Sequence, residues 1–229
     1  MSIFSSLLHH PKTSLVAKQF VGTEPEIDRW TVSEFIVDKI VPIVGVRPYP
    51  LSELEMLVAI VLWYKPSHIC DWGTHFGKAT RIFYETVHTF NLKTKIISID
   101  LPANVDHIEH PHGERGKFVK NIPSVELLLG DGVTTSLACL KKSSRKNIRP
   151  LFFLDGDHSY KSVKRELNLI GKAYPRSAII IHDTFYQSKD SNYNVGPYLA
   201  VTEYLAKHQQ YKVVYTNLGL PGMTTLLPI

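Results

Sequence analysis

A short apolar run that ends in acidic residues, residues 150–158, constrains the fold of this chain more than any other stretch. Its four consecutive apolar residues, 151–154, are too few for a helix and are closed by a glycine, so they predict a strand buried on both faces of a parallel sheet. A second apolar run, within residues 178–184, ends in the same way. Because ligands bind beyond the carboxyl ends of strands in open α/β sheets, we expect Asp155 and Asp183 to share a metal ion at neighbouring strand tips.

Strand-like and helix-like segments alternate from residue 52 to the C-terminus. Apolar residues have helical spacing in 52–64, 78–90, 159–174 and 197–208, and Ser52 is a suitable cap for the first of these helices. Further strands are predicted at 68–71, 95–100, 125–129 and 178–181, and a hairpin at 211–216 and 223–227. This order indicates an α/β fold, a doubly wound, mostly parallel seven-stranded Rossmann-like sheet with a C-terminal antiparallel hairpin strand.

The chain length and composition suit one such domain with a small appendage. Of the 229 residues, 44% are hydrophobic, which is enough to bury a sizeable core. We expect the domain to span residues 46–229, preceded by an N-terminal extension at residues 1–45. Such an extension is a lid, a dimer contact that would make the protein a homo-oligomer, or a helix packed on the core, and the sequence does not choose among them.

The charge balance is basic, with a net charge of +5 and a pI near 9.1. A basic surface attracts phosphate, nucleic acid or an acidic metabolite, but the charges are scattered apart from one cluster in residues 141–146 that suits a solvated loop or an anion-binding patch. The two cysteines have no metal-binding spacing. No signal peptide is evident, and the apolar run 57–64 is too short for a bilayer, so we expect a cytoplasmic protein with no membrane contact.

A glycine loop follows the first predicted strand, with the pattern Asp71-x-Gly73-x-x-x-Gly77 and Thr74 inside it. Glycines at such a turn let the backbone approach a ligand, and the next helix offers free N–H groups. The pattern lacks the G-x-G-x-x-G spacing of a dinucleotide site. An acid before the glycines instead suits a cofactor that carries an ammonium group or ribose hydroxyls, which are properties of S-adenosylmethionine.

Two further acids end the second and third predicted strands. Asp100 is placed to accept hydrogen bonds from both ribose hydroxyls, because an ionised carboxylate offers two acceptor oxygens. Asp131 follows Gly130 and is placed to meet the adenine amino group. For each acid taken singly, the alternative is a helix N-cap or a solvated turn. The succession of five strands that end in acids favours the cofactor interpretation.

These motifs together resemble the class I S-adenosylmethionine-dependent methyltransferases. More narrowly, the chain is similar from residue 53 to residue 229 to the small-molecule O-methyltransferases called the methyltransferase 24 or cephalosporin hydroxylase/rhamnosyl O-methyltransferase-like group. The most specific part is the segment Leu-Asp-Gly-Asp-His-Ser-Tyr at 154–160. Two departures, Trp72 in the glycine loop and Pro-Arg-Ser at 175–177, remove no expected ligand.

The acids after the fourth and fifth strands are the expected metal ligands. Asp155 and Asp183 are hard oxygen donors suited to Mg²⁺ or Mn²⁺, and Thr184 is the candidate third ligand where catechol-type relatives often carry Asn. The resemblance implies that a catechol or vicinal diol acceptor chelates this ion. The alternative for either aspartate is a cap on the following helix or turn.

His158, three residues after Asp155, is the candidate general base, since its ordinary pKa near 6.5 suits proton removal at neutral pH. The relatives carry Lys or His at the same distance from the metal aspartate. Asp157 would orient His158 or join the metal shell, and His182 would line the same pocket or be a core group. Neither pair of alternatives is decided by the sequence.

The sequence therefore predicts transfer of a methyl group from S-adenosylmethionine to a hydroxyl of a small molecule, a sugar or a phenolic natural product. A nucleic-acid methyltransferase is disfavoured because the fourth strand is not followed by an Asn/Asp-Pro-Pro-aromatic segment. A non-catalytic nucleotide-binding domain of the same fold is the other alternative. A zinc site at His107, His110 and His112 is disfavoured because their segment is rich in Pro, Gly and charge, as surface loops are.

Overall fold

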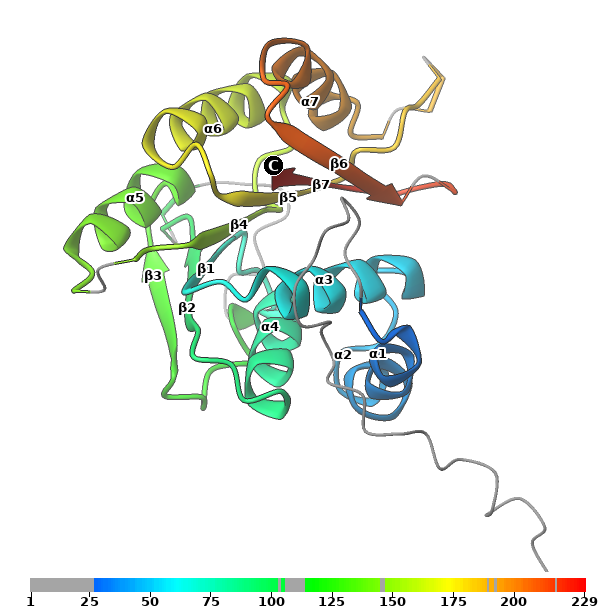
Figure 1. The fold of residues 1–229 in the computed structure, drawn as a ribbon, viewed down its shortest axis with the longest axis vertical. Helices are drawn as coiled ribbons and strands as arrows, with labels where there is room; N and C mark the ends of the chain where they lie inside the picture. Colours follow the sequence, from blue (N-terminus) through cyan, green and yellow to red (C-terminus); the bar gives the residue numbers. More distant parts are fainter. Residues whose placement is uncertain are drawn as a thin grey trace, which may run out of the picture.

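A seven-stranded sheet forms the centre of the molecule in the computed structural model, which describes residues 27–102, 104–105, 114–144, 147–188, 190–191, 193–216 and 218–229. The strand order is β3-β2-β1-β4-β5-β7-β6 (Figure 1). The strands are β1 His68–Trp72, β2 Lys95–Asp100, β3 Val125–Leu129, β4 Pro150–Leu154, β5 Ala178–His182, β6 Tyr211–Thr216 and β7 Met223–Pro228. The predicted fold class is confirmed.

The topology places the carboxyl ends of five parallel strands at one edge. β1 pairs in parallel with both β2 and β4, and β7 is antiparallel to both β5 and β6. The chain adds strands outward from β1 to β3 and then crosses back to β4. The connections after β1 and β4 therefore lead away from each other, and such a switch point leaves a crevice where α/β proteins bind ligands.

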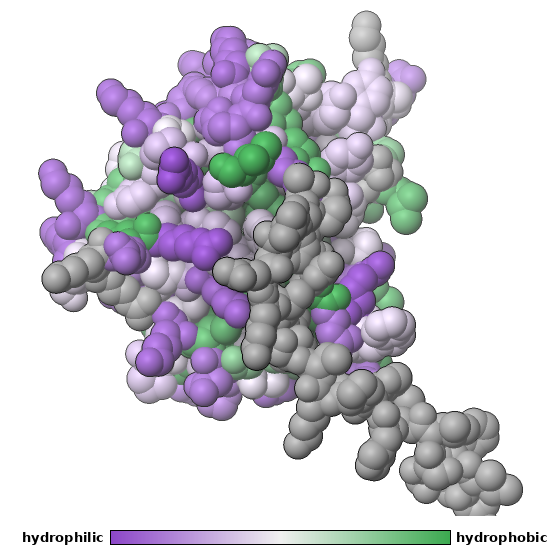
Figure 2. Space-filling view, in the orientation of Figure 1, coloured by the Kyte–Doolittle hydropathy of each residue, from purple (hydrophilic) through white to green (hydrophobic). Residues whose placement is uncertain are grey.

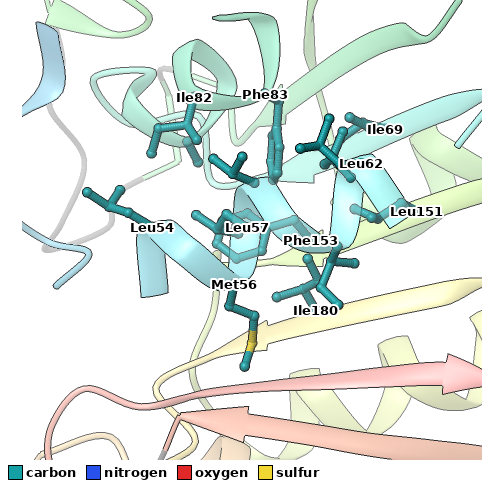
Figure 3. Packing of buried hydrophobic residues seen from close by; sticks show 14 of the residues in the cluster. Leu54, Met56, Leu57, Leu62, Ile69, Ile82, Phe83, Leu151, Phe153 and Ile180 are labelled. Atoms are coloured by element: carbon teal, nitrogen blue, oxygen red, sulfur yellow. The ribbon is translucent and has the colours of Figure 1, made fainter. Parts of the chain in front are cut away.

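Helices cover both faces of the sheet (Figure 1). One face carries α3 Leu51–Tyr64 and α4 Lys78–Thr89, and the other carries α5 Gly132–Lys142, α6 Tyr160–Ala173 and α7 Gly196–Lys207. The strand residues alternate between these layers because successive side chains of a strand point to opposite faces. Phe153 packs with α3 and α4, as Figure 3 shows, whereas Phe152 packs with the other layer. This double burial explains why β4 is apolar throughout.

The N-terminal helical segments belong to the same core. α1 Arg29–Phe35 is capped by Asp28 and continues through a π-helix at Ile36–Ile40 into α2 Val41–Val44. Their buried residues join the cluster around α3. Residues 27–44 thus pack on the domain, while the predicted lid or dimer contact of the extension stays a prediction.

Most predicted elements lie within two residues of the observed ones, with one local correction. Ser52 does not cap α3, because the helix begins at Leu51 after Pro50 and has no side-chain cap. Hydrophilic residues predominate over the outer surface of α6 and α7 (Figure 2), as expected for α6, which buries Val163, Leu167 and Ile170 on one face. None of the helices in the described part of the chain is long and apolar enough to span a membrane.

Candidate active site

The glycine loop between β1 and α4 packs tightly against the end of β4. Gly73 has φ +85°, and a Cβ there would lie 2.1 Å from the carbonyl oxygen of Asp155. Gly77, the residue before α4, has the same φ. Both positions therefore need glycine, one for a close backbone approach and both for their dihedral angles.

Asp71 lies beneath this loop and not in an open cleft. Its side chain is buried, and Oδ2 accepts hydrogen bonds from the hydroxyls of Thr80 and Ser98. Its Oδ1 is buried and has no partner among the described residues. Burial raises the pKa of Asp71 to about 7, against the lowering effect of the two hydroxyls. Thr74 is also tied to Ser98, with their hydroxyl oxygens 2.7 Å apart.

Asp100 faces a cleft at the ends of β1, β2 and β3. Its Oδ2 accepts the backbone N–H of His75 at 3.0 Å, and its Oδ1 accepts that of Leu101 at 2.8 Å. Arg115 approaches the same carboxylate to 3.1 Å. The carboxylate thus fixes the glycine loop as well as lining the cleft. The cleft is also lined by Trp72, Gly73, Ile99, Gly130, Asp131, Gly132, Gly156, Asp157, Ser162 and Glu166.

Asp131 also lines this cleft, and both of its carboxylate oxygens accept hydrogen bonds. It caps α5 by accepting the backbone N–H of Thr134 at 3.0 Å. Arg165 donates to both carboxylate oxygens, at 2.9 and 3.1 Å. Although burial opposes the change, the hydrogen bonds from Arg165 and Thr134 lower the pKa of Asp131 to about 2. The helix-cap alternative is therefore realised, at a position that still lines the cleft.

The ends of β4 and β5 bring two acids and two histidines together. His158 Nε2 lies 3.4 Å from Asp155 Oδ1 and 3.2 Å from Asp183 Oδ2. Tyr193 and Asn194 donate to Asp183, at 3.1 and 2.6 Å. The sequence expectation that both aspartates and His158 converge is met by this geometry.

His182 also belongs to this group, which we call the acid–histidine cluster (Asp155, His158, His182 and Asp183). Its Nδ1 lies 2.9 Å from Asp155 Oδ1 and 3.4 Å from Asp183 Oδ1, but the ring is not oriented to form a hydrogen bond with either. Its Nε2 lies 3.0 Å from the buried carboxylate of Glu53. His182 therefore lines the pocket with Nδ1. Its Nε2 is held in the core by Glu53, so the ring is both a pocket residue and a core residue.

Three findings at this cluster differ from the sequence expectations. Thr184 does not reach it, because its hydroxyl is buried against Thr224 at 2.7 Å, on the side of another cavity. The sequence did not predict Glu53 or Tyr49. Glu53 contacts His182 and accepts a hydrogen bond from the backbone N–H of Gly222, and the Tyr49 hydroxyl donates a hydrogen bond to Asp155. For Glu53, the signal in the sequence was an acidic residue within the mostly apolar segment 52–64.

The charges of the cluster reinforce one another. Burial opposes ionisation of Asp155, but the charges of His182 and His158 and a hydrogen bond from His158 hold its pKa well below the usual range. Burial likewise opposes protonation of His158, yet Asp155 and Asp183 raise the pKa of its ring. The same two aspartates and Glu53 raise that of His182 well above its ordinary value. The site is thus a compact alternation of negative and positive groups.

A larger cavity opens above the cluster, with a volume of about 1010 Å³. Gly73 and His75 line both this cavity and the cleft at Asp100, so the two spaces adjoin at the glycine loop. Its outer walls come from three loops, which supply Val46, Arg47, Pro48, Tyr49, Pro50, Tyr193, Asn194, Leu220 and Pro221. The segment with His107, His110 and His112, where a zinc site was disfavoured, falls outside the described residues, as do Arg145 and Lys146 of the basic cluster.

The cluster has the donor atoms that a divalent cation needs. Asp155, His158 and His182 each offer one ligand atom, all within 4.8 Å of one another, and the Asp183 carboxylate adjoins them. Carboxylates suit Mg²⁺ and Mn²⁺, and imidazoles suit transition metals better than Mg²⁺. The buried Nδ1 of His182, which lacks a hydrogen bond, is an observation that fits such a cation.

A protein-family model, described as rhamnosyl O-methyltransferase/CmcI, matches residues 46–217, which is well over half of the chain. The chain belongs to this family. It is therefore an S-adenosylmethionine-dependent O-methyltransferase, and the resemblance drawn from its motifs is confirmed. No sequence among the curated proteins compared matches the chain significantly.

Solved structures show that this methyltransferase shares its fold with distant relatives. TomG from Streptomyces achromogenes, solved with S-adenosylmethionine, is 12% identical with a TM-score of 0.56, covering 90% of this chain and 92% of that chain. PaMTH1 from Podospora anserina, bound to S-adenosylhomocysteine, is 14% identical with a TM-score of 0.55, covering 88% and 87%. CalS11, a TDP-rhamnose 3'-O-methyltransferase, is 16% identical with a TM-score of 0.54, covering 85% and 86%.

Proposed function

We propose that this methyltransferase binds S-adenosylmethionine in the cleft at Asp100 and methylates a hydroxyl of a small molecule held in the 1010 Å³ cavity. The observation that carries the proposal is the shared wall at Gly73 and His75. A donor in one space and an acceptor in the other meet at this wall, beside the acid–histidine cluster. Holding two reactants in line is a large part of the catalysis of methyl transfer.

Each cofactor residue has a proposed part. Asp100 binds the ribose hydroxyls, and Gly73 gives the methionine part access to the loop backbone. Asp71, whose Oδ1 is buried with no partner among the described residues, is the proposed counterion of the ammonium group, whose charge favours ionisation of a carboxyl group with a pKa of about 7. Gly77 and Thr74 hold the loop in shape, and Asp131 borders the adenine end of the cleft.

His158 is the proposed general base. Its Nε2 faces the cavity between Asp155 and Asp183, where an acceptor hydroxyl would lie. The two carboxylates raise the pKa of the ring in spite of burial, so the imidazole can retain the proton that it takes. Tyr49 keeps the Asp155 carboxylate in place by donating to its other oxygen.

Asp155, Asp183 and the ring nitrogen of His182 are the proposed ligands of a divalent cation. When bound, such a cation supplies Lewis acidity that lowers the pKa of an acceptor hydroxyl. Mn²⁺ is favoured over Mg²⁺ by the imidazole in the set. His158 remains available as the base in this arrangement, because only one nitrogen donor is needed beside the two carboxylates.

A sugar hydroxyl is the favoured acceptor within the class of small hydroxylated molecules. The family description names rhamnosyl acceptors, and CalS11 acts on a TDP-linked rhamnose. The cavity offers hydrogen-bonding groups from Asn194, Tyr193 and His75 along with its apolar walls. Nucleic acid is disfavoured as the acceptor, because the β4 end carries the acid–histidine cluster instead of an Asn/Asp-Pro-Pro-aromatic segment.

The test has a binding arm and a transfer arm. Calorimetric titration with S-adenosylhomocysteine, in Mn²⁺ and again in EDTA, is expected to give micromolar binding, with NAD as the non-binding control. Methyl transfer from labelled S-adenosylmethionine is then measured on a rhamnoside, on catechol and on a short RNA. Transfer to the rhamnoside that EDTA abolishes and Mn²⁺ restores is the expected result; transfer to RNA alone would overturn the proposed acceptor, and transfer unaffected by EDTA the metal.

A further inference from the structure

We propose that Glu166 reads the adenine edge of S-adenosylmethionine, its neutral carboxyl group donating one hydrogen bond to a ring nitrogen and accepting one from the amino group. This proposal rests on the assignment of the cofactor to the cleft at Asp100. It adds a specificity residue that neither the glycine loop nor the strand-end acids supply.

The position of Glu166 along the cleft identifies the part of the cofactor that it meets. Gly73 and His75 mark the end that adjoins the acceptor cavity, so the sulfonium belongs there. Asp100 is assigned to the ribose, and Ser162 and Glu166, on α6, line the cleft but not the acceptor cavity. With the methyl group at one end and the ribose between, the nucleobase occupies the end that contains Glu166.

Glu166 has an unused hydrogen-bonding oxygen at this end. The residue is 8% exposed, and its Oε1 accepts a hydrogen bond from Ser162 at 3.2 Å. Within the described part of the chain, no group forms a hydrogen bond with Oε2. Asp131, in contrast, is engaged on both oxygens by Arg165 and Thr134. Of these two acids, Glu166 is therefore the one with an oxygen that accepts no hydrogen bond from the described residues.

The surroundings of Glu166 favour its neutral form. Burial is the main cause and raises its pKa to about 7. The nearby charges of Asp131 and Asp157 act in the same direction, whereas a hydrogen bond from Ser162 and the charge of Arg165 oppose it. These groups come from the β3–α5 turn, the β4–α6 turn and α6 itself.

A neutral carboxyl group matches the edge of adenine. It presents one O–H donor beside one acceptor oxygen, and adenine presents an acceptor ring nitrogen beside a donor amino group. An ionised carboxylate has acceptors alone, so one of its oxygens would face the lone pair of the ring nitrogen. Because Ser162 donates to Oε1, that oxygen is the acceptor and Oε2 carries the proton, which fixes the order of donor and acceptor. Hypoxanthine carries the opposite pattern, with a carbonyl oxygen beside an N–H, and is expected to bind less well.

The proposal predicts a pH dependence of cofactor binding with a defined sign. Because the competent form is protonated, the affinity is highest below the pKa of Glu166 and falls as the pH rises through it. The apparent Kd is the intrinsic Kd divided by the competent fraction, so it rises about tenfold between pH 6 and pH 8.

The experiment is calorimetric titration of the full chain with S-adenosylhomocysteine and its hypoxanthine analogue, S-inosylhomocysteine, at pH 6, 7 and 8. Glu166→Gln keeps one donor and one acceptor without a titrating group, so it is expected to bind within about threefold of the wild type at pH 6 and to lose the pH dependence. Glu166→Ala is expected to bind about tenfold more weakly at pH 6, and to lose about tenfold of the preference for adenine. Glu34→Gln, an exposed change on α1, is the control.

The outcomes distinguish an error in the assignment of the cofactor to the cleft from an error in the role of Glu166. A wild-type protein that binds neither ligand at any pH would overturn the assignment of the cofactor, and this proposal with it. A wild-type protein that binds S-adenosylhomocysteine, with Glu166→Ala showing the same adenine preference and the same pH profile, would overturn the role of Glu166 alone. Thermal melting of each variant establishes that a loss of binding is not a loss of fold.

Discussion

The cofactor cleft and the acceptor cavity adjoin at the glycine loop, but they are built from different kinds of chain segment. The cleft is lined mainly by residues that directly follow β1, β2, β3 and β4, together with two residues of α6. The cavity is lined by the ends of β4 and β5, and its outer walls come from residues 46–50, 193–194 and 220–221. A parallel sheet thus supplies one generic site and one site whose chemistry depends on loops.

The cleft and the cavity also differ in the groups that surround their acids. The acids that face the cleft from strand ends are mostly engaged by backbone N–H groups or by single cations, as Asp100 is by His75 and Asp131 is by Arg165. The acids of the cavity instead lie beside two histidines, of which His182 is buried and His158 is half-buried. The first arrangement suits binding of the cofactor, and the second suits proton transfer or metal binding.

The largest expected effect is at the acid–histidine cluster. Asp155→Asn removes the charge beside both histidines, so we expect methyl transfer to fall ~10²–10⁴-fold, the range typical of lost acid–base function. Binding of S-adenosylhomocysteine is expected to change by less than about threefold, because Asp155 faces the other space. Asp190→Asn, an exposed change, is the control. Retention of more than about a tenth of the activity would contradict the division between the two sites.

The next effect breaks the wall that the two sites share. Gly73→Ala places a Cβ 2.1 Å from the Asp155 carbonyl oxygen at φ +85°, so we expect it to lower the free energy of unfolding by about 3 kcal/mol or more. Gly45→Ala is the matched control, because Gly45 has φ +73° and no atom within 4 Å of the added Cβ. Its ψ of −166° puts it in a region that essentially only glycine adopts, so its expected cost is about 1–3 kcal/mol. Urea unfolding measures both, and equal costs would show that the close approach is unimportant.

A smaller effect is expected in the cofactor cleft. Asp100→Ala removes a carboxylate that lines the cleft and that accepts the N–H of His75, so we expect S-adenosylhomocysteine to bind ~10–100-fold more weakly. The rate of methyl transfer at saturating cofactor is expected to stay within a few-fold. Calorimetry and a titration of S-adenosylmethionine in the assay separate the two quantities. A change confined to the rate would move Asp100 from cofactor binding to the reaction itself.

The smallest effect concerns Thr184, the third metal ligand expected from sequence. Since its hydroxyl pairs with Thr224, Thr184→Val is expected to leave activity and Mn²⁺ affinity within about twofold and to cost about 1 kcal/mol of stability. Thr224→Val removes the same hydrogen bond and serves as the matched variant. A strong loss of Mn²⁺ affinity in Thr184→Val alone would restore Thr184 to the metal site.

The fold was predictable because its signals are local and repeated. The apolar segments ending at Asp100, Leu129 and Leu154 have the period and length of buried strands, and the structure gives the predicted bounds to within two residues. The convergence of Asp155, His158 and Asp183 was also predictable, because parallel strands that are neighbours end at one edge. Glu53 and Tyr49 were not, because a residue on α3 and one before it reach Asp155 and His182 through packing across more than 100 positions of the chain.

The sequence by itself determined the order of strands and helices, the glycine loop and the chemistry of the strand ends, since each depends on residues close together in the chain. The tertiary structure alone decided which oxygens remain free for a ligand. Asp131 and Glu166 are both acids that line the cofactor cleft, but Arg165 donates to both oxygens of the first and Ser162 to only one oxygen of the second. Hydrogen-bond capacity is a property of the assembled neighbourhood, and it is fixed only when the helices pack on the sheet.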